Sequence, residues 1–163
     1  MHFGLITPGH YPQVAEIYLA GIKTGNATFE TGVPSYELWD KKHLPFGRIA
    51  LFTGNKMLGW AALSKVSDRC VYNGVAEVSI YVAPGSARIG IGTQLLIKLI
   101  EESEKNGLWT LQCGIMKENT ASIKLHQKCG FRKIGYREKI GKLHGVWRDN
   151  IIMERRSRKQ IFN

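Results

Sequence analysis

The sequence has few cysteines and no long apolar segment. Cys70, Cys113 and Cys129 are odd in number and share no C-x-x-C spacing, so they predict reduced thiols rather than a disulfide framework. His126 and Cys129 have a metal-ligand spacing, but no second pair completes a zinc site. No run is apolar enough to span a bilayer, and the N-terminus shows no signal-peptide pattern. We therefore expect a cytoplasmic protein with no metal and no membrane partner.

Acidic residues are also scarce, because 13 Asp and Glu face 23 Lys and Arg, which gives a net charge of +10 and a pI of about 9.7. Such a balance raises nucleic-acid binding as a possible function. The densest basic run, residues 155–159, lies near the C-terminus, however, where a solvated tail is the simpler interpretation. No zinc-finger or aromatic RNA-binding signature accompanies it. We expect no nucleic-acid partner, and the scattered charge is equally compatible with an anionic small ligand such as a nucleotide-containing cofactor.

The composition and the alternation of elements predict the fold class. With 163 residues, 44% of them hydrophobic, we expect one domain over residues 1–154 and a basic tail over 155–163. Short strands and helices alternate without repeats, which favours an α/β or α+β layer fold in the order β-α-α-β-β-β-α-β-α-β-β. The expected strands are 3–6, 48–53, 57–66, 76–82, 108–115, 132–140 and 147–153. The expected helices lie within 7–25, 35–43, 90–107 and 119–129.

The most informative stretch is 76–93, AEVSIYVAPGSARIGIGT. Its first half alternates, so the apolar side chains from Ala76 to Val82 share one face and Glu77 points to the other. A Pro-Gly turn and a G-x-G loop then precede an amphipathic helix, whose N-terminal N–H groups attract anions. The loop lacks the third glycine of a dinucleotide fingerprint and the Gly-Lys-Ser/Thr of a Walker loop. A phosphate site and a plain structural turn both remain open for it.

A second motif lies in the helix expected over 119–129. Asn119 is a good N-cap, and Gly130 with Phe131 is typical of a glycine C-cap with its hydrophobic contact. Ser122 and His126 are four residues apart and therefore share one helix face. The motif places a hydroxyl and an imidazole side by side.

These motifs, in this element order, resemble the GNAT family of acetyl-CoA-dependent N-acetyltransferases over essentially the whole chain. The R-x-G-x-G loop, the N-x-x-S helix start and the following G-F carry the resemblance. Segments 27–31, 77–82, 125–127 and 145–149 are similar to the phosphinothricin acetyltransferase branch. Segments 137–142 and 154–157 are similar to relatives that act on arsinothricin.

The resemblance implies a central, twisted, mostly antiparallel mixed sheet flanked by helices, in which a splay between two strands holds acetyl-CoA. It also implies which residues contact the cofactor. A structural turn is the alternative for the loop, and helix capping explains Asn119 equally well. The cofactor residues are Ile80, Tyr81, Val82, Arg88, Ile89, Gly90, Ile91, Gly92, Thr93, Asn119 and Ser122.

Glu77 and His126 match the catalytic positions of the family. An ammonium cannot attack a thioester until a base frees its lone pair, and Glu77 matches that base. His126 stands where many relatives carry a tyrosine that protonates the leaving thiolate, and an imidazole can donate or accept a proton near neutral pH. A solvent-facing strand residue and a structural helix histidine are the respective alternatives. No cysteine falls on a catalytic position, which argues against an acetyl-enzyme.

The resemblance places Phe29, Glu30, Tyr72, Asn73 and Trp147 near the substrate, although aromatic core packing explains Trp147 equally well. Two positions depart from the family pattern. Ala87 replaces the polar residue that usually leads the cofactor loop. Asn73 replaces an arginine suited to a substrate carboxylate or phosphinate, so either the acceptor differs or another basic residue binds it.

By resemblance, then, we expect a homodimeric enzyme that acetylates the α-amino group of a small amino-acid-like compound, such as phosphinothricin or methionine sulfoximine. The amine would attack acetyl-CoA directly in a ternary complex. Acetylation of a protein N-terminus is the first alternative. A basic nucleic-acid-binding domain is the second.

Overall fold

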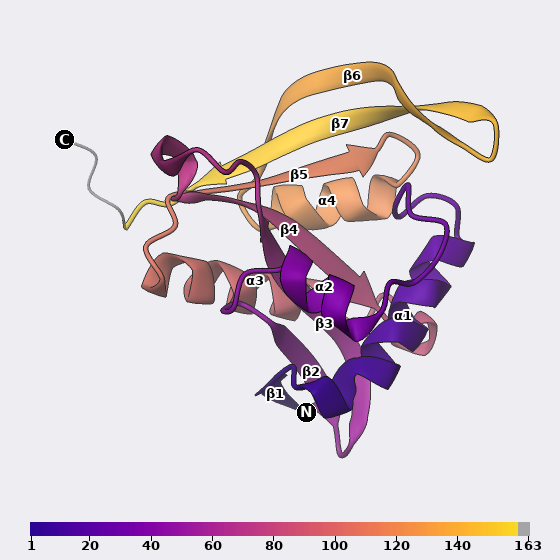
Figure 1. Ribbon diagram of the computed structural model, residues 1–163, viewed down its shortest axis with the longest axis vertical. Coiled ribbons are helices and arrows are strands. Elements are labelled where there is room, and N and C mark those ends of the chain that lie inside the picture. The colour runs from indigo at the N-terminus through magenta and orange to yellow at the C-terminus, as the bar shows by residue number, and fades with distance from the viewer. Residues whose placement is uncertain (160–163) are drawn as a thin grey trace.

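The computed structural model describes residues 1–159, which form one seven-stranded sheet and four α-helices (Figure 1). The strand order is β1-β2-β3-β4-β5-β7-β6, and β4 and β5 form its parallel pair. The strands are β1 His2–Leu5, β2 Ile49–Thr53, β3 Lys56–Lys65, β4 Val75–Val82, β5 Thr110–Met116, β6 Arg132–Leu143 and β7 Val146–Arg156. The helices are α1 Tyr11–Lys23, α2 Tyr36–Lys42, α3 Ile91–Lys105 and α4 Thr120–Lys128.

The element order predicted from the sequence is confirmed, and its local signals act as expected. Ser35 caps α2, because its side chain accepts a hydrogen bond from Leu38 N. Gly130 follows α4 with φ of 89°, a left-handed value that suits glycine, and Phe131 beside it is buried. Short 3-10 turns lie at Pro8–His10, Cys70–Tyr72 and Pro84–Ser86.

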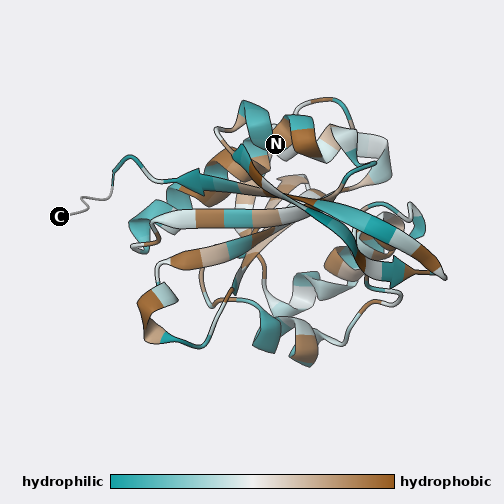
Figure 2. Cartoon of the chain, turned by 90° about the horizontal axis from the view of Figure 1, so that it is seen from above, coloured by the Kyte–Doolittle hydropathy of each residue, from teal (hydrophilic) through white to brown (hydrophobic). Residues whose placement is uncertain are grey.

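Helices cover both faces of the sheet, and each face has its own core. On one face Val78, Ile80 and Val82 pack against α3 and α4. On the other face Tyr81 packs with α1 and with Trp39 of α2. The alternation along β4 therefore separates two cores, and the face that carries Glu77 is partly covered by aromatic rings. Figure 2 shows hydrophobic and hydrophilic residues mixed along the strands, so parts of the sheet are covered on one face only.

The C-terminal basic run is attached to the domain as far as Lys159. Strand β7 continues to Arg156, past the domain end expected at residue 154. The buried carboxylate of Glu104 on α3 receives Arg155 Nη1 and Ser157 Oγ at 3.0 Å and Lys159 Nζ at 3.1 Å. These contacts give the basic residues a structural role. Residues 160–163 of the expected tail lie outside the described part of the chain.

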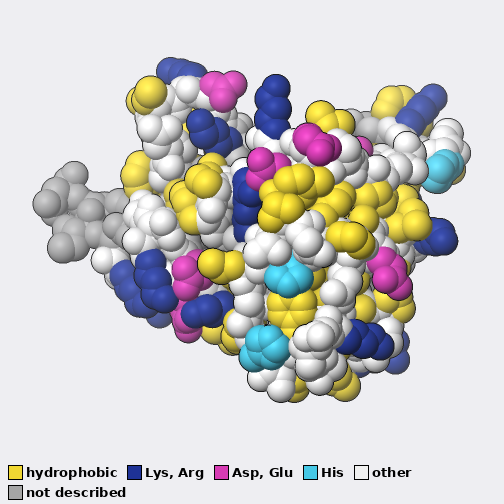
Figure 3. Space-filling view, turned by 60° about the horizontal axis from the view of Figure 1, so that its bottom comes forward, with side chains coloured by type: hydrophobic (Ala, Val, Ile, Leu, Met, Phe, Trp, Pro, Cys, Tyr) yellow, Lys and Arg dark blue, Asp and Glu magenta, His cyan; other side chains and the backbone are white. Residues whose placement is uncertain are grey.

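The surface charge, the helices and the metal-binding side chains of residues 1–159 bear on which partners the protein can have. On the face in Figure 3, Lys and Arg side chains are interspersed with Asp, Glu and hydrophobic ones. None of the helices in this range is both long and apolar enough to span a membrane. No group of three His, Cys, Asp or Glu in the same range is arranged to hold a metal ion.

Candidate active site

The main cleft lies where the two parallel strands part. Strands β4 and β5 are paired through three positions, Val75 with Thr110, Ala76 with Leu111 and Glu77 with Gln112. Beyond Glu77, β4 runs on to Val82 and β5 to Met116 without further pairing between the two strands. Backbone groups of β4 that face β5 are therefore left for other partners, since strand N–H and C=O groups need hydrogen bonds. Glu77 stands at the vertex of this splay.

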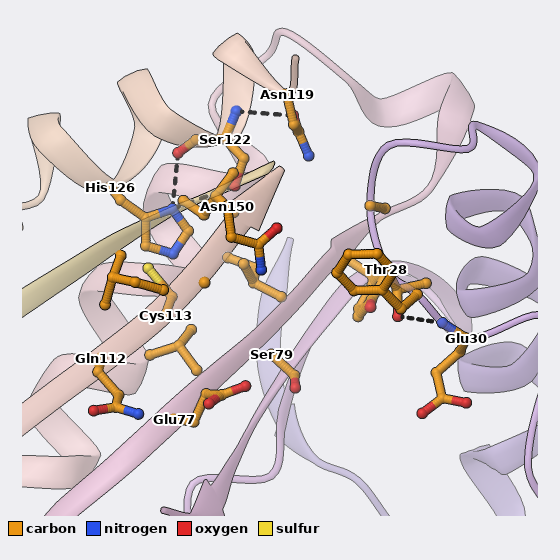
Figure 4. Close-up of a pocket in the computed structure, with 18 of the residues that line it drawn as sticks. Thr28, Glu30, Glu77, Ser79, Gln112, Cys113, Asn119, Ser122, His126 and Asn150 are labelled. Carbon is orange, nitrogen blue, oxygen red and sulfur yellow. Dashed lines mark hydrogen bonds between the residues drawn. The ribbon is translucent and has the colours of Figure 1, made fainter. Parts of the chain in front are cut away.

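A cavity of about 440 Å³ occupies the opening. Figure 4 shows Glu77 and Gln112 at one end, His126, Ser122 and Asn150 along one side, and Thr28 and Glu30 opposite. The walls come from β4, β5, the start of α4, the loop before α2 and the C-terminal hairpin. They include Tyr18, Ala27, Thr28, Phe29, Glu30, Lys42, Glu77, Ser79, Ile80, Tyr81, Gln112, Cys113, Asn119, Ser122, His126, Ile134, Arg137 and Asn150.

His126 is held in a single tautomer by its own helix. Its Nδ1 lies 2.8 Å from the Ser122 carbonyl oxygen, which can only accept, so Nδ1 carries the hydrogen. Its Nε2 is buried and has no partner within residues 1–159. Burial lowers the pKa of His126, and the hydrogen bond to Ser122 opposes this only in part. Nε2 of the neutral ring therefore keeps its lone pair, which suits accepting a hydrogen bond or a proton better than donating one.

Cys113 also lines the cavity, which the sequence did not predict. Burial, and then the negative charge of Glu77, raise the pKa of its thiol to about 12. The thiol is therefore protonated at neutral pH and a poor nucleophile. This supports the expectation that no acetyl-enzyme forms on a cysteine.

The start of α4 combines capping with exposure to the cavity. Asn119 Oδ1 accepts a hydrogen bond from Ser122 N at 3.2 Å, and Asn119 Nδ2 donates to the Asn26 carbonyl at 3.3 Å. Helix capping, the alternative explanation for Asn119, is therefore present. Both Asn119 and Ser122 line the cavity as well, so the two roles are compatible.

The predicted phosphate loop forms the start of α3, beside this cavity rather than in its wall. Gly90 is the N-cap with φ of 84°, and Arg88 also has a positive φ of 66°. Ile91 is only 1% exposed, so it offers backbone rather than side chain to a ligand. A Cβ at Gly92 would lie 3.1 Å from Leu125 Cδ2, so this glycine also allows α3 to approach α4. The free N–H groups of the first helical turn remain suited to an anion.

Of the predicted acceptor residues, the structure brings Phe29 and Glu30 into the cavity and leaves three outside it. Tyr72 is 45% exposed beneath the Arg69 guanidinium, and Asn73 ends the same short turn. Trp147 is 52% exposed, with Lys142 Nζ 4.9 Å from its ring centroid, so it is not core packing either. Within one copy of residues 1–159, these three side chains do not line the site.

The structure adds cavity residues that the sequence analysis missed, above all Lys42 and Arg137. Arg137 projects from β6 and has no acidic partner among the described residues, whereas Arg132 on the same strand is paired with Glu154. A local bulge between Arg137 and Gly141 shifts the pairing of β6 with β7. Neither a motif nor a simple alternation could have placed Arg137 in the site.

Comparisons with known proteins decide the family. The sequence profile of the acetyltransferase (GNAT) family matches residues 16–131. The chain belongs to this family. It has the GNAT fold, with a mixed seven-stranded sheet whose β4 and β5 are parallel, and it is an acetyl-CoA-dependent N-acetyltransferase.

Its relatives include the expected branch. A phosphinothricin N-acetyltransferase of Alcaligenes faecalis is 33% identical over 151 residues, which cover 88% of this chain and 76% of that protein. An L-methionine sulfoximine/L-methionine sulfone acetyltransferase of Pseudomonas aeruginosa is 32% identical over 106 residues, 65% of this chain and 62% of that one. The crystal structure of a phosphinothricin acetyltransferase from Sinorhizobium meliloti with bound acetyl-CoA matches with a TM-score of 0.84 at 26% identity, over 95% of this chain and 87% of that one.

Proposed function

We propose that this GNAT enzyme transfers the acetyl group of acetyl-CoA to the α-amino group of a small amino-acid-like substrate, such as methionine sulfoximine or phosphinothricin. The observation that carries the proposal is the position of Glu77 at the vertex of the β4–β5 splay, facing a cavity of about 440 Å³. The acceptors named for the relatives in Alcaligenes and Pseudomonas support the same substrate class.

The cofactor contacts follow from the unpaired edge of β4 and the start of α3. Backbone groups of Ile80, Tyr81 and Val82 would bind the amide groups of the pantetheine arm, as a neighbouring strand would. The first-turn N–H groups from Ile91 to Thr93, with Arg88 and Ile89 in the preceding loop, would bind the pyrophosphate. Ala87 offers no polar side chain there, so Arg88 is the nearest cation in the loop.

The reaction needs one base and no covalent intermediate. The substrate ammonium loses a proton to Glu77, directly or through a water, and the amine nitrogen attacks the thioester carbonyl carbon. A C–N bond forms, the C–S bond breaks, the acylated nitrogen gives up its surplus proton, and the leaving thiolate takes up one proton, so that the products are the amide and the free thiol of CoA. Neutral His126 Nε2 would accept a hydrogen bond from a bound group, so its role is positioning rather than acid catalysis. The raised pKa of Cys113 supports direct attack.

The cavity offers a positively charged side chain that can bind the acceptor's α-carboxylate, although Asn73 stands where an arginine was expected. Arg137 lines the cavity and has no acidic partner among the described residues, and Lys42 lies on the same cavity 3.8 Å from Glu30. A guanidinium binds a carboxylate with two parallel hydrogen bonds. We propose that Arg137 binds this carboxylate, because Asn73 has no positive charge with which to bind it.

We also propose a homodimer. Several apolar side chains of the β6–β7 hairpin are exposed in one copy, and such patches favour association. A second copy is also the available route by which Tyr72 or Trp147 would approach a site. Sedimentation analysis tests the state, and a monomer at working concentration would remove both residues from the substrate site. The exposed side chains are Ile134, Tyr136, Ile140, Val146 and Trp147.

The test of the function is an acceptor screen with acetyl-CoA, read as release of free thiol. Methionine sulfoximine, phosphinothricin and free amino acids should be acetylated at the α-amine, as mass spectrometry would verify. Short peptides are the control for N-terminal acetylation. A preference for peptides would replace the proposal with that alternative. Acetyl-CoA itself should raise the melting temperature, and a protein unaffected by it would have no functional cofactor site.

A further inference from the structure

One wall of the active-site cavity is a loop that the C-terminal hairpin holds in place. The loop spans residues 25–30, which we call the 25–30 loop, and it follows α1 (Figure 1). Between the end of α1 at Lys23 and the start of α2 at Tyr36 the chain forms neither helix nor strand, so contacts with other elements must fix this wall. The wall residues are Ala27, Thr28, Phe29 and Glu30.

Arg148 of β7 makes the polar contacts with the 25–30 loop. Its Nη1 donates a hydrogen bond to the Gly25 carbonyl at 2.7 Å, and its Nη2 donates to Asn26 Oδ1 at 2.6 Å. Nη2 also lies 3.1 Å from Glu118 Oε2, in the turn before α4. The side chain is only 13% exposed, so these charge-assisted bonds are largely shielded from water. Arg148 therefore ties the loop both to β7 and to the start of α4.

Gly141 of β6 makes the apolar contact. A Cβ at this position would lie 2.9 Å from Phe29 Cε1 and 3.1 Å from Phe29 Cζ, closer than carbon atoms normally pack. The φ of Gly141 lies outside the left-handed region, so packing rather than backbone conformation favours glycine here. The Phe29 ring thus occupies the space that a side chain at position 141 would fill.

The two contacts come from a single rung of the hairpin. Gly141 and Arg148 are directly opposite each other in the pairing of β6 with β7, and cross-strand partners share one face. Two residues further along β7, Asn150 is opposite Arg137, and both of these line the cavity. The rung therefore sets the distance between the 25–30 loop and the part of the hairpin that carries Arg137.

We propose that Gly141 and Arg148 are positioning residues, which set the width of the acceptor side of the cavity by holding the 25–30 loop at a fixed distance from the hairpin. Neither residue lines the cavity itself, so each acts through the loop. The inference rests on the proposed acetylation of amino acids, in which Phe29 and Glu30 face the acceptor. Simple stabilisation of the fold is the competing explanation, and it would leave acceptor binding unchanged.

Arg148 is tested by a split between two affinities. Arg148→Gln should raise the KM for L-methionine sulfoximine about tenfold and leave the Kd of acetyl-CoA unchanged, and Arg148→Lys, which keeps the charge, should raise that KM less. Arg155→Gln is the matched control, because Arg155 lies on the same strand, is 20% exposed and bonds Glu104 instead. It should lower the melting temperature without changing the KM. An unchanged KM in Arg148→Gln, or an equal rise in Arg155→Gln, overturns the proposal.

Gly141 is tested by a double-mutant cycle with Phe29. Gly141→Ala should displace the ring and raise the KM for L-methionine sulfoximine severalfold. In a Phe29→Ala background the same change should have no further effect, because the ring that it displaces is absent. Gly135→Ala is the control on the same strand, since a Cβ there would meet nothing within 4 Å. Additive effects of Gly141→Ala and Phe29→Ala overturn the role of Gly141.

Hydrogen exchange tests the position of the loop without turnover. In the full-length protein, amides of the 25–30 loop should exchange about tenfold faster in Arg148→Gln than in the wild type, and Arg155→Gln should not change them. Unchanged exchange in Arg148→Gln overturns the proposal, even if the enzyme acetylates amino acids. A wild type that acetylates no amino acid overturns the proposed function instead, and the exchange rates still decide whether Arg148 holds the loop.

Discussion

The proposed cofactor half and the proposed acceptor half of the cleft are built in different ways. The cofactor half comes mainly from one continuous stretch, β4 and the loop that starts α3, with the capped start of α4 beside it. The acceptor half is assembled from the loop over 27–30, from α2 and from β6, which are far apart in sequence. Glu77 lies where the halves meet. Under the proposed function, a local motif would specify how the acetyl donor is held, while tertiary packing would specify what receives the acetyl group.

The largest expected effect is at the junction, because both halves depend on Glu77. Glu77→Gln should lower kcat by about 100-fold or more, the usual contribution of a general base, while the Kd of acetyl-CoA stays the same. Stopped-flow thiol release and calorimetry measure the two quantities. Glu16→Gln, an exposed carboxylate on α1, is the control for charge. Turnover that survives in Glu77→Gln would remove this residue from the mechanism.

The buried His43 of the acceptor half should also make the free energy of unfolding fall at acidic pH. The pKa of His43 falls from 6.5 to about 4 on folding, so the unfolded chain binds this proton more readily. The contribution of the buried, neutral His43 to the free energy of unfolding is complete above pH 6.5 and is lost as the pH falls toward 4. Between pH 7 and 4.5 the free energy of unfolding should drop by about 2–3 kcal/mol from this group.

Urea unfolding at the two pH values measures that drop. His43→Phe should reduce it, although not abolish it, because burial lowers the pKa of His126 in the same direction. His144→Asn, on an exposed residue of the hairpin loop, should leave the pH dependence unchanged. An equal drop in His43→Phe and wild type would contradict the account of the buried imidazole.

Arg137 tests the acceptor half alone. Arg137→Gln should raise the KM for an α-amino acid about tenfold, since a charge-assisted hydrogen bond contributes about 1.5–3 kcal/mol. The KM for the corresponding amino-acid amide, which has no carboxylate, should not change. Arg132→Gln removes a guanidinium from the same strand, already paired with Glu154, and serves as the matched control. Equal effects on acid and amide would show that Arg137 does not bind the carboxylate.

Arg88 tests the cofactor half, with the smallest expected effect because exposed ion pairs contribute about 0.2–1 kcal/mol. Asparagine tolerates the positive φ at position 88. The Arg88→Asn variant should therefore stay folded and raise the KM of acetyl-CoA up to about fivefold. The KM of the acceptor should stay constant. Lys98→Gln, on α3, controls for the lost positive charge. If the acceptor's KM also rises, the two halves are less independent than their construction indicates.

What the sequence could predict follows the same division. The G-x-G loop, the Asn119 cap and the alternation around Glu77 are local signals, and each lies where it was expected. Arg137 lines the cavity from a long hairpin whose pairing shifts on both sides of this residue, which periodicity does not reveal. Trp39 and Trp60 belong to no motif in the sequence, and their buried, unpaired N–H groups depend on how α2 meets β3. Long-range packing, rather than any motif, decides such positions.

The strand order also determines when the enzyme is complete. β7 follows every other strand in the described chain, yet it lies between β5 and β6 (Figure 1). During synthesis, β6 has no sheet neighbour until β7 emerges and pairs with both strands at once. One wall of the cleft, including Asn150, therefore forms last, and sheets that depend on such distant pairing fold slowly. A nascent chain can fold the donor-binding motif early, but it gains a closed catalytic cleft only after β7 has been synthesised.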